Sequence, residues 1–148
     1  LALIRIVDRN LYKSFVDNQN FISLIYRMSI KAKALLFGLN YAHCKSGKLN
    51  GCINDVQNMS NYIRSLMNMP MPIEIYTDDT DLKSTSYDGI INKLYDLAIE
   101  SYRENLDYVW IHYSGHGSYQ KDVSGDEEDG YDEGLVPSPS SHSDHVCR

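Results

Sequence analysis

The sequence predicts a three-layer α/β/α protein, in which helices cover both faces of a mostly parallel sheet. Three short apolar runs typical of strands alternate with two stretches whose apolar residues recur at helical spacing. Strands and helices that alternate along a chain form parallel sheets with right-handed crossovers. The 148 residues, 43% of them hydrophobic and 11% aromatic, suit one folded domain and exclude a disordered chain.

The first predicted strand is the apolar run 34–39, which is short, continuous and ended by turn residues, as in a strand buried on both faces. After a polar loop at 40–51, an amphipathic helix is predicted to begin near Cys52 and to end before Pro70. Its apolar residues share one helical face, which would cover the sheet. They are Cys52, Val56, Met59, Ile63 and Leu66.

The next two strands are predicted at 73–76 and 108–113, where β-branched and aromatic residues predominate. Between them, a second helix is predicted to begin near residues 84–86, with Thr85 and Asp88 spaced as a capping box. The third strand breaks abruptly at 114–117. Sites in parallel sheets form outside the carboxyl ends of the strands, so the sequence predicts a site at this break.

The two ends of the chain carry weaker signals. Residues 1–29 have no sustained period and are interpreted as a weakly helical leader of uncertain structure. Residues 138–148 are rich in Ser and are predicted to be a disordered tail. The folded domain is therefore expected at 30–137, and we expect its three-stranded sheet to leave an edge through which the protein self-associates.

Nearly all of the net charge of −6 comes from one segment. Between Asp122 and Glu133 stand seven acidic residues and no basic one, and the rest of the chain holds 13 acidic against 14 basic residues. This balance lacks the basic surface that nucleic-acid binding requires. No window approaches the roughly 18 apolar residues of a membrane span, so neither nucleic acid nor membrane is an expected partner. Three cysteines do not make a disulfide framework, which favours a reducing compartment such as the cytoplasm.

His116 stands between two glycines at the end of the third predicted strand. Gly115 and Gly117 would let the backbone turn sharply and leave the imidazole accessible, and the Gly117 N–H could approach a reacting carbonyl oxygen. This combination suits a general base beside an oxyanion donor. The alternative is a glycine-rich turn with a surface histidine, and the spacing alone favours neither. His112, earlier on the same strand, is better interpreted as a packed strand residue.

Three motifs in this order resemble the type I metacaspases. They are Leu49–Val56, Tyr113–Gly117 and Asp126–Glu133. The similarity runs from about Lys33 to Pro137. Metacaspases are caspase-like cysteine endopeptidases with a caspase-hemoglobinase fold, so the resemblance implies that fold and that activity.

The resemblance also implies roles for individual residues. His116 would be the catalytic histidine, and the Gly117 amide the oxyanion donor. Cys52, Asp55 and Ser114 would line the primary specificity pocket, whose carboxylate favours peptide substrates with Arg or Lys before the cleaved bond. A buried carboxylate pairs well with such cations. From the residues alone, Asp55 also fits the first turn of a helix and Cys52 a small core position.

The acidic segment has two interpretations. Aligned on Gly130, an EF-hand would need a carboxylate where Gly125 stands, so the segment is not an EF-hand. By resemblance, Asp132 would be one ligand of the Ca²⁺ that many metacaspases need for activation. The other interpretation is a solvated acidic loop, because one ligand with its neighbours would bind calcium weakly.

The resemblance finally predicts where a nucleophile should lie. In caspase-like enzymes the cysteine follows the histidine by roughly 50 residues, which falls beyond Arg148. Cys147 lacks the surrounding family pattern, Cys44 matches no catalytic position, and Cys52 could serve only as a surrogate thiol. We therefore expect the larger-subunit portion of a cysteine endopeptidase, with little or no activity alone. The alternative is a catalytically dead caspase-like module that binds partners.

Overall fold

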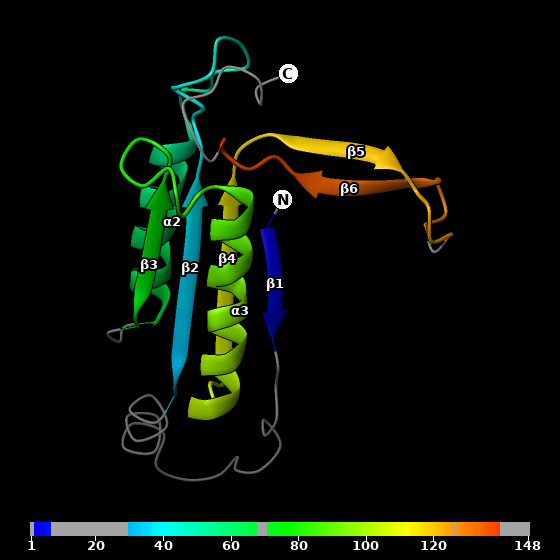
Figure 1. Ribbon diagram of the computed structural model, residues 1–148. Helices are drawn as coiled ribbons and strands as arrows, with labels where there is room; N and C mark the ends of the chain where they lie inside the picture. Colours follow the sequence, from blue (N-terminus) through cyan, green and yellow to red (C-terminus); the bar gives the residue numbers. More distant parts are fainter. Residues whose placement is uncertain (1, 7–29, 68–70, 126, 140–148) are drawn as a thin grey trace, which may run out of the picture.

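A computed structural model describes residues 2–6, 30–67, 71–125 and 127–139 of the protein. Within this part, a four-stranded sheet has the strand order β1–β4–β2–β3, and a separate two-stranded sheet is formed by β5 and β6. Figure 1 shows a helix on each face of the larger sheet and the smaller sheet projecting from its end as a hairpin. The predicted three-layer α/β/α class with a mostly parallel sheet is confirmed, and it agrees with a caspase-like fold.

The parallel part of the sheet consists of β2 (Ala32–Gly38), β3 (Ile73–Thr77) and β4 (Tyr108–Ser114). Helix α2 (Cys52–Met67) connects β2 to β3, and α3 (Tyr87–Glu104) connects β3 to β4. The central strand is β2, in which Leu36 lies opposite Ile75 on one side and His112 on the other. All three carboxyl ends therefore lie at one edge of the sheet, as the predicted order requires.

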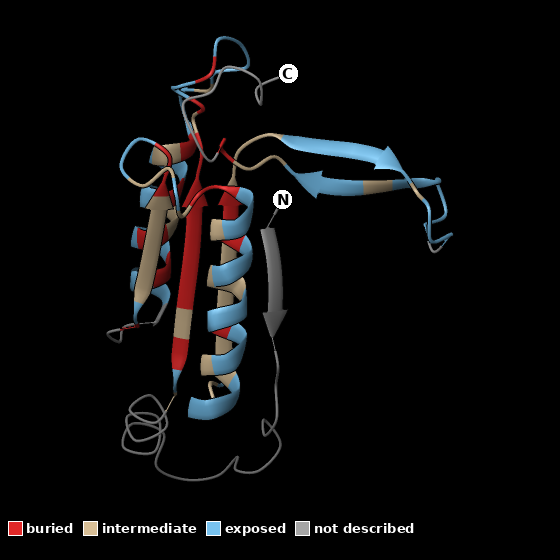
Figure 2. Ribbon diagram, in the orientation of Figure 1, coloured by how far each residue is buried: buried red, intermediate tan, exposed pale blue. Residues whose placement is uncertain are grey.

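The sheet has a hydrophobic core on each face, because the continuous apolar run of β2 points alternate side chains to opposite sides. The core facing α2 contains Ala32, Ala34, Leu36, Val56, Ile63 and Met71. The core facing α3 contains Leu35, Phe37, Leu39, Tyr41, Cys44, Ile90, Leu97 and Tyr113. Figure 2 shows the buried residues concentrated in β2 and along the inner sides of both helices. Each fully buried aliphatic side chain stabilises the fold by about 1.5–3 kcal/mol.

Gly38 brings the start of α2 against the carboxyl end of β2. A Cβ at this position would lie 2.8 Å from the carbonyl oxygen of Cys52 and 2.8 Å from a methyl group of Val56. Only glycine leaves room for that approach. The first turn of α2, with Cys52 and Asp55, is thereby held at the edge of the sheet where the candidate site was predicted.

The N-cap of helix α3 is one of the three predicted candidates, residues 84–86, but it is not the Thr85 of the predicted capping box. Ser86 is the N-cap, and its hydroxyl accepts a hydrogen bond from the Gly89 N–H at 3.2 Å. The hydroxyl of Thr85, which is fully buried, instead donates to the carbonyl oxygens of Asp81 and Leu82. The helix ends at Asn105 in the left-handed conformation. Within the described ranges, neither helix has the length and apolar character needed to cross a bilayer.

Strand β1 (Ala2–Ile6) pairs antiparallel with the outer edge of β4, from Ala2 opposite His112 to Ile6 opposite Tyr108. The weakly helical interpretation is wrong for these residues, because the unpaired backbone groups of β4 offer partners to an extended segment. Residues 7–29 of the predicted leader lie outside the described residues. In this part of the chain, β3 is the outer strand on the opposite side, and self-association through a sheet edge stays a prediction.

The acidic segment lies largely on a hairpin that the sequence did not predict. Strands β5 (Gly117–Lys121) and β6 (Tyr131–Leu135) pair antiparallel, so the segment is partly strand and not simply a loop. Figure 2 shows the hairpin as mostly exposed. Every residue of β5 is exposed. A strand without a buried face has no apolar alternation, which explains why the sequence pattern missed it.

The chain is anchored again immediately after the predicted domain end. Ser138 is buried and its backbone N–H donates to the carbonyl oxygen of Thr85 at 2.9 Å. Pro139 is also buried. These two residues are therefore part of the folded protein, contrary to the predicted disordered tail, and residues 140–148 lie outside the described residues.

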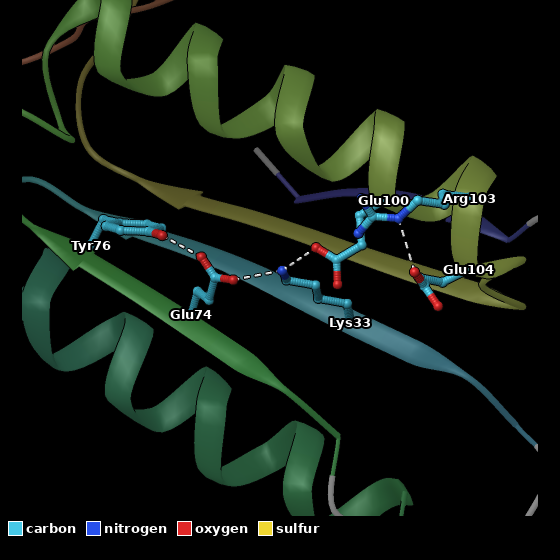
Figure 3. A network of polar contacts seen from close by, with 6 residues as sticks. All are labelled: Lys33, Glu74, Tyr76, Glu100, Arg103 and Glu104. Atoms are coloured by element: carbon cyan, nitrogen blue, oxygen red, sulfur yellow. Dashed lines mark hydrogen bonds and ion pairs between the residues drawn. The ribbon is translucent and has the colours of Figure 1, made fainter.

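A polar network crosses the sheet beneath α3 (Figure 3). The Lys33 ammonium lies 2.6 Å from Glu74 of β3 and 2.5 Å from Glu100 of α3. Tyr76 donates its hydroxyl hydrogen to Glu74, and the ammonium of Lys93 lies 4.8 Å from the centre of the Tyr76 ring. Lys33 therefore links β2, β3 and α3.

Candidate active site

The candidate site lies at the carboxyl ends of β2 and β4, where three segments meet. These segments are the loop 39–51 after β2, the first turn of α2 and the turn 114–117 after β4. His116 comes from the turn and is half-buried. The predicted position of the site, outside the ends of parallel strands, is where these segments converge.

The imidazole of His116 is held by the loop after β2. Its Nε2 lies 2.6 Å from the carbonyl oxygen of Gly47, and its ring lies 4.8 Å from the ring of Tyr41, tilted by 32°. A carbonyl oxygen only accepts hydrogen bonds, so Nε2 is the nitrogen that carries the hydrogen. In the neutral imidazole Nδ1 then has the free lone pair, which is the state that a general base needs.

A pair of buried tyrosines supports the histidine from below. The hydroxyl groups of Tyr41 and Tyr113 lie 2.8 Å apart, and the backbone N–H of His116 donates to the Tyr41 hydroxyl at 2.9 Å. Both hydroxyls also reach the carbonyl oxygen of Val136, at 2.6 and 2.7 Å. Burial raises the pKa of both phenols, and their mutual hydrogen bond raises the pKa of Tyr113 further. Both tyrosines therefore stay protonated at neutral pH.

Gly115 makes room for this tyrosine pair. A Cβ at this position would lie 2.5 Å from the Tyr113 hydroxyl and 2.8 Å from the Tyr41 hydroxyl. Neither Gly115 nor Gly117 has a positive φ, so the turn between β4 and β5 does not need a backbone conformation reserved for glycine. Gly115 is required by close packing, and not by a backbone conformation that other residues avoid.

The amide of Gly117 points away from the hairpin partner. The Val136 N–H donates to the carbonyl oxygen of His116, and the Asp122 N–H donates to the carbonyl oxygen of Gly130. The pairs His116–Val136 and Asp122–Gly130 are therefore hydrogen-bonded pairs of the antiparallel ladder. Such pairs alternate with non-hydrogen-bonded ones, so the pair Gly117–Leu135 is of the second kind. The Gly117 N–H is thus directed outward beside His116, as an oxyanion donor would need.

The three residues predicted to line the specificity pocket come together. Ser114 of β4 donates its hydroxyl hydrogen to Asp55 of α2 at 2.8 Å. Cys52 is buried, and its backbone N–H donates to the Asn40 side chain at 3.0 Å. Asp55 is exposed, so the expectation of a buried carboxylate is wrong for the chain as it stands. Its position in the first turn of α2 also agrees with the interpretation as a helix-terminal acid.

Sequence reasoning missed two further residues of the site, Tyr41 and Asp78. Asp78, which follows β3, is almost fully buried and accepts the backbone N–H groups of Asn40 and Tyr41 at 2.9 and 2.5 Å. It therefore fixes the start of the loop that holds His116. Asp78 is at least 37 positions from its two partners in the sequence, so no local sequence pattern predicts these contacts.

A cavity of about 820 Å³ opens beside the histidine, between the hairpin, β4 and α3. His116 and Gly117 form part of its wall. The remaining lining is mainly apolar and includes Leu94, Ile111, Tyr119, Tyr131 and Leu135. The hairpin thus forms one side of a space large enough for several side chains of a polypeptide.

The acidic hairpin does not by itself make a metal site. The carboxylate of Asp122 accepts backbone N–H groups of Gly125 and Glu127, which lower its pKa and commit it to the turn. Asp132, the predicted calcium ligand, is half-buried on β6. Among the described residues, no three His, Cys, Asp or Glu side chains lie close enough together to hold a metal ion. These residues do not fit a calcium site, and no step of the chemistry is assigned to calcium.

The described ranges contain two of the three cysteines, Cys44 and Cys52. Cys44 is disulfide-bonded and so carries no thiol for attack. Cys52 is the free cysteine within the described ranges. It lies in the predicted specificity pocket, and Cys147 lies outside the described residues.

Comparison with known proteins decides the family. The sequence model of the family described as metacaspase, peptidase C14 domain matches residues 32–148. The chain belongs to the metacaspases. This match covers the whole sheet except β1, and it extends beyond Pro137, where we expected the resemblance to end. The metacaspase is thereby placed among the cysteine peptidases of family C14, as the three motifs indicated.

Curated metacaspases of fungi are similar over most of this chain. Metacaspase-1 of Pyricularia oryzae is 38% identical over 119 residues, which are 78% of this chain and 29% of that protein. Metacaspase-1 of Coccidioides immitis is 40% identical over 78% of this chain and 25% of its own length. Metacaspase-1 of Sclerotinia sclerotiorum is 37% identical over 86% of this chain and 30% of its own length. The present metacaspase thus spans less than a third of each of these relatives.

Proposed function

We propose that this metacaspase chain supplies the base, the oxyanion donor and the specificity pocket of a cysteine endopeptidase that cleaves after Arg or Lys. The observation that carries the proposal is the setting of His116. Its Nε2 is engaged by the Gly47 carbonyl at 2.6 Å, and the outward-pointing amide of Gly117 is its neighbour in sequence. This arrangement leaves Nδ1 as the base.

The proposed reaction runs through an acyl-enzyme. His116 Nδ1 takes the proton of a cysteine thiol, and the thiolate attacks the peptide carbonyl carbon. The Gly117 N–H donates to the oxyanion that forms, and His116 then gives its proton to the leaving amine. Water hydrolyses the thioester and regenerates the thiol. We assign the thiol to a segment of the protein outside the residues described.

Specificity for basic residues rests on Asp55. Ser114 donates to one oxygen of its carboxylate, Oδ2, and this hydrogen bond orients the group. The other oxygen can accept from a guanidinium or an ammonium group, and such charge-assisted hydrogen bonds are the strong ones. We propose that an Arg or Lys side chain of the substrate enters here, which removes the carboxylate from water.

The test is a peptidase assay with an arginine peptide, applied to this chain and to the complete protein. We expect little or no turnover by the chain alone. In the complete protein, His116→Ala should abolish turnover, whereas Cys52→Ala should retain it if Cys52 only lines the pocket. Robust turnover by the chain alone would contradict a nucleophile outside it, and full activity of His116→Ala would contradict the proposed base.

Calcium dependence is a separate proposal, which rests on Asp132 alone. Because Ca²⁺ takes six to eight oxygen ligands, Asp132 needs further ligands from other parts of the protein. Calorimetric titration of the complete protein and of its Asp132→Asn variant tests this. Equal calcium affinity of the two proteins would remove Asp132 from the site.

A second candidate is a caspase-like module that binds partners without catalysis. It is favoured by one observation, that the free thiol in the described ranges is buried in the predicted pocket. The complete protein distinguishes the two candidates. A binding module would retain an arginine peptide without cleaving it, and an endopeptidase would turn it over.

A further inference from the structure

Tyr41 adopts a backbone conformation that tyrosine rarely takes. Its φ is 54°, in the left-handed region that residues with a Cβ usually avoid. The strain is held by Asp78, which accepts the N–H groups of Asn40 and Tyr41 and is itself 1% exposed. Conformations of this kind persist only where the surroundings impose them, and they cluster at functional sites.

The Tyr41 hydroxyl has a full set of partners, all at the candidate site. It donates to the carbonyl oxygen of Val136 at 2.6 Å. Its two lone pairs are left to accept the backbone N–H of His116 at 2.9 Å and the hydroxyl of Tyr113 at 2.8 Å. A hydroxyl group has one hydrogen to donate and two lone pairs, so this assignment satisfies it completely.

One loop supplies two of the contacts of the histidine ring. The Tyr41 ring lies 4.8 Å from the His116 ring, and the Gly47 carbonyl accepts from Nε2. Further backbone hydrogen bonds, from Cys44 to Tyr41 and from Leu49 to Asn40, close this loop on itself. The position of Gly47 is therefore tied to that of Tyr41.

We propose that Tyr41 is the positioning residue of the catalytic histidine, an inference that rests on the proposed function of His116. Its hydroxyl fixes the His116 backbone, and its ring and loop hold the imidazole with Nε2–H on Gly47 and Nδ1 free. Asp78 acts on His116 only through Tyr41, because it holds Tyr41 in its left-handed conformation. A tyrosine that only filled the core would leave the tautomer of His116 unaffected.

The test is NMR of the chain labelled with ¹⁵N, in wild type and in Tyr41→Phe. The side-chain nitrogen shifts of His116 report its tautomer, and hydrogen exchange reports the protection of its amide. Tyr76→Phe is the matched control, because it also removes a hydrogen-bonded phenol hydroxyl at this sheet, one whose partner is Glu74 and not a residue of the site. His116→Ala identifies the His116 signals among the five histidines.

In Tyr41→Phe we expect the His116 amide to exchange roughly five- to tenfold faster, because one hydrogen bond is lost. We also expect the shifts to move from a pure Nε2–H tautomer to a mixture, while Tyr76→Phe leaves both readouts unchanged. Wild-type shifts and exchange in Tyr41→Phe would overturn the proposal, even if the melting temperature fell.

Two further measurements separate the possible failures. If Tyr41→Phe does not fold, the wild-type protein must still show the Nε2–H tautomer and nuclear Overhauser contacts between the Tyr41 and His116 rings. Their absence overturns the proposal. No substrate enters these experiments, so an active His116→Ala variant of the complete protein would refute the catalytic role without changing the result for Tyr41.

Discussion

Because Gly115 has no side chain, the backbone next to His116 can lie against the hydroxyl groups of Tyr41 and Tyr113. We predict that Gly115→Ala destabilises the protein by about 1–3 kcal/mol, because the new Cβ collides with two buried hydroxyl groups. Gly117→Ala is the control, since its Cβ would have Gly134 as nearest contact at 3.8 Å. Urea unfolding of both variants measures the difference. Equal losses would show that the tyrosine pair does not restrict residue 115.

Asp55 offers a second test at the residue scale. In the complete protein, Asp55→Asn should lower kcat/KM for arginine peptides about tenfold or more, because a charge-assisted hydrogen bond is lost. Asp88→Asn is the control, since Asp88 is the acid in the first turn of α3. If Asp55 serves only the helix dipole, both variants should lose about 0.3–1 kcal/mol of stability and keep full specificity.

Sequence reasoning located only part of the site at this scale. The turn with His116, and the partners Asp55 and Ser114, could be predicted because their motifs resemble a family with known roles. Tyr41 and Asp78 could not be predicted. Their contribution depends on hydrogen bonds between loops that only the fold brings together, and a buried aspartate or tyrosine in a loop has no distinctive spacing.

At the scale of elements, Lys33 connects two strands and a helix through part-buried ion pairs. Burial alone would lower the pKa of Lys33, but hydrogen bonds to Glu100 and Glu74 outweigh burial and raise it. Burial would raise the pKa of Glu74, but its hydrogen bonds with Lys33 and Tyr76 outweigh burial and lower it. The contribution of Glu74 is therefore complete above its ordinary pKa of 4.5 and disappears as the pH falls through its lower folded-state pKa.

We predict that Glu74→Gln reduces the free energy of unfolding by about 1 kcal/mol at pH 7. The difference from wild type should vanish at acidic pH, where Glu74 of the wild type is protonated and resembles glutamine. Urea unfolding between pH 7 and pH 3 measures this convergence. Glu104→Gln is the control, because Glu104 pairs with Arg103 at an exposed position and should change stability little. A constant difference at every pH would contradict the ionic contribution.

Helices and strands could be predicted where burial on one face makes apolar residues recur at a regular spacing along the sequence. Strands β2, β3 and β4 and helices α2 and α3 lie within a few residues of their predicted positions, because each buries an apolar run or stripe. The hairpin β5–β6 buries no such face and was missed. Strand β1 was missed for another reason, since its pairing depends on the free edge of a strand about a hundred residues later.

The whole molecule combines a sheet with two cores and a hairpin that lies outside both. Figure 1 shows the hairpin extending away from the sheet, beyond the end of β4. It forms a wall of the large cavity but contributes no residue to either buried cluster. The arrangement of strands in the main sheet followed from the alternation of elements, whereas the direction of the hairpin has no counterpart in the sequence pattern.

We predict that the tip of the hairpin can be shortened without loss of stability. Replacing residues 123–129 by Asn-Gly keeps the hydrogen-bonded pair of Asp122 and Gly130 and closes it with a favoured two-residue turn. The free energy of unfolding should change by no more than about 0.5 kcal/mol, because surface changes of this kind have small effects. Thermal and urea unfolding measure it. A loss of several kcal/mol would mean that the tip supports the fold.

Val136 connects the exposed hairpin to the residues that hold His116 in place. Its carbonyl oxygen accepts from Tyr41 and lies 2.7 Å from the Tyr113 hydroxyl, and its amide donates to the carbonyl oxygen of His116, yet it directly follows the exposed strand β6. Amides of the central strand β2 should open only with global unfolding, whereas the hairpin should open at a much lower free energy. Each such local opening strains the hydrogen bonds at Val136. The order of the candidate site is then limited by the least stable segment of the molecule and not by its core.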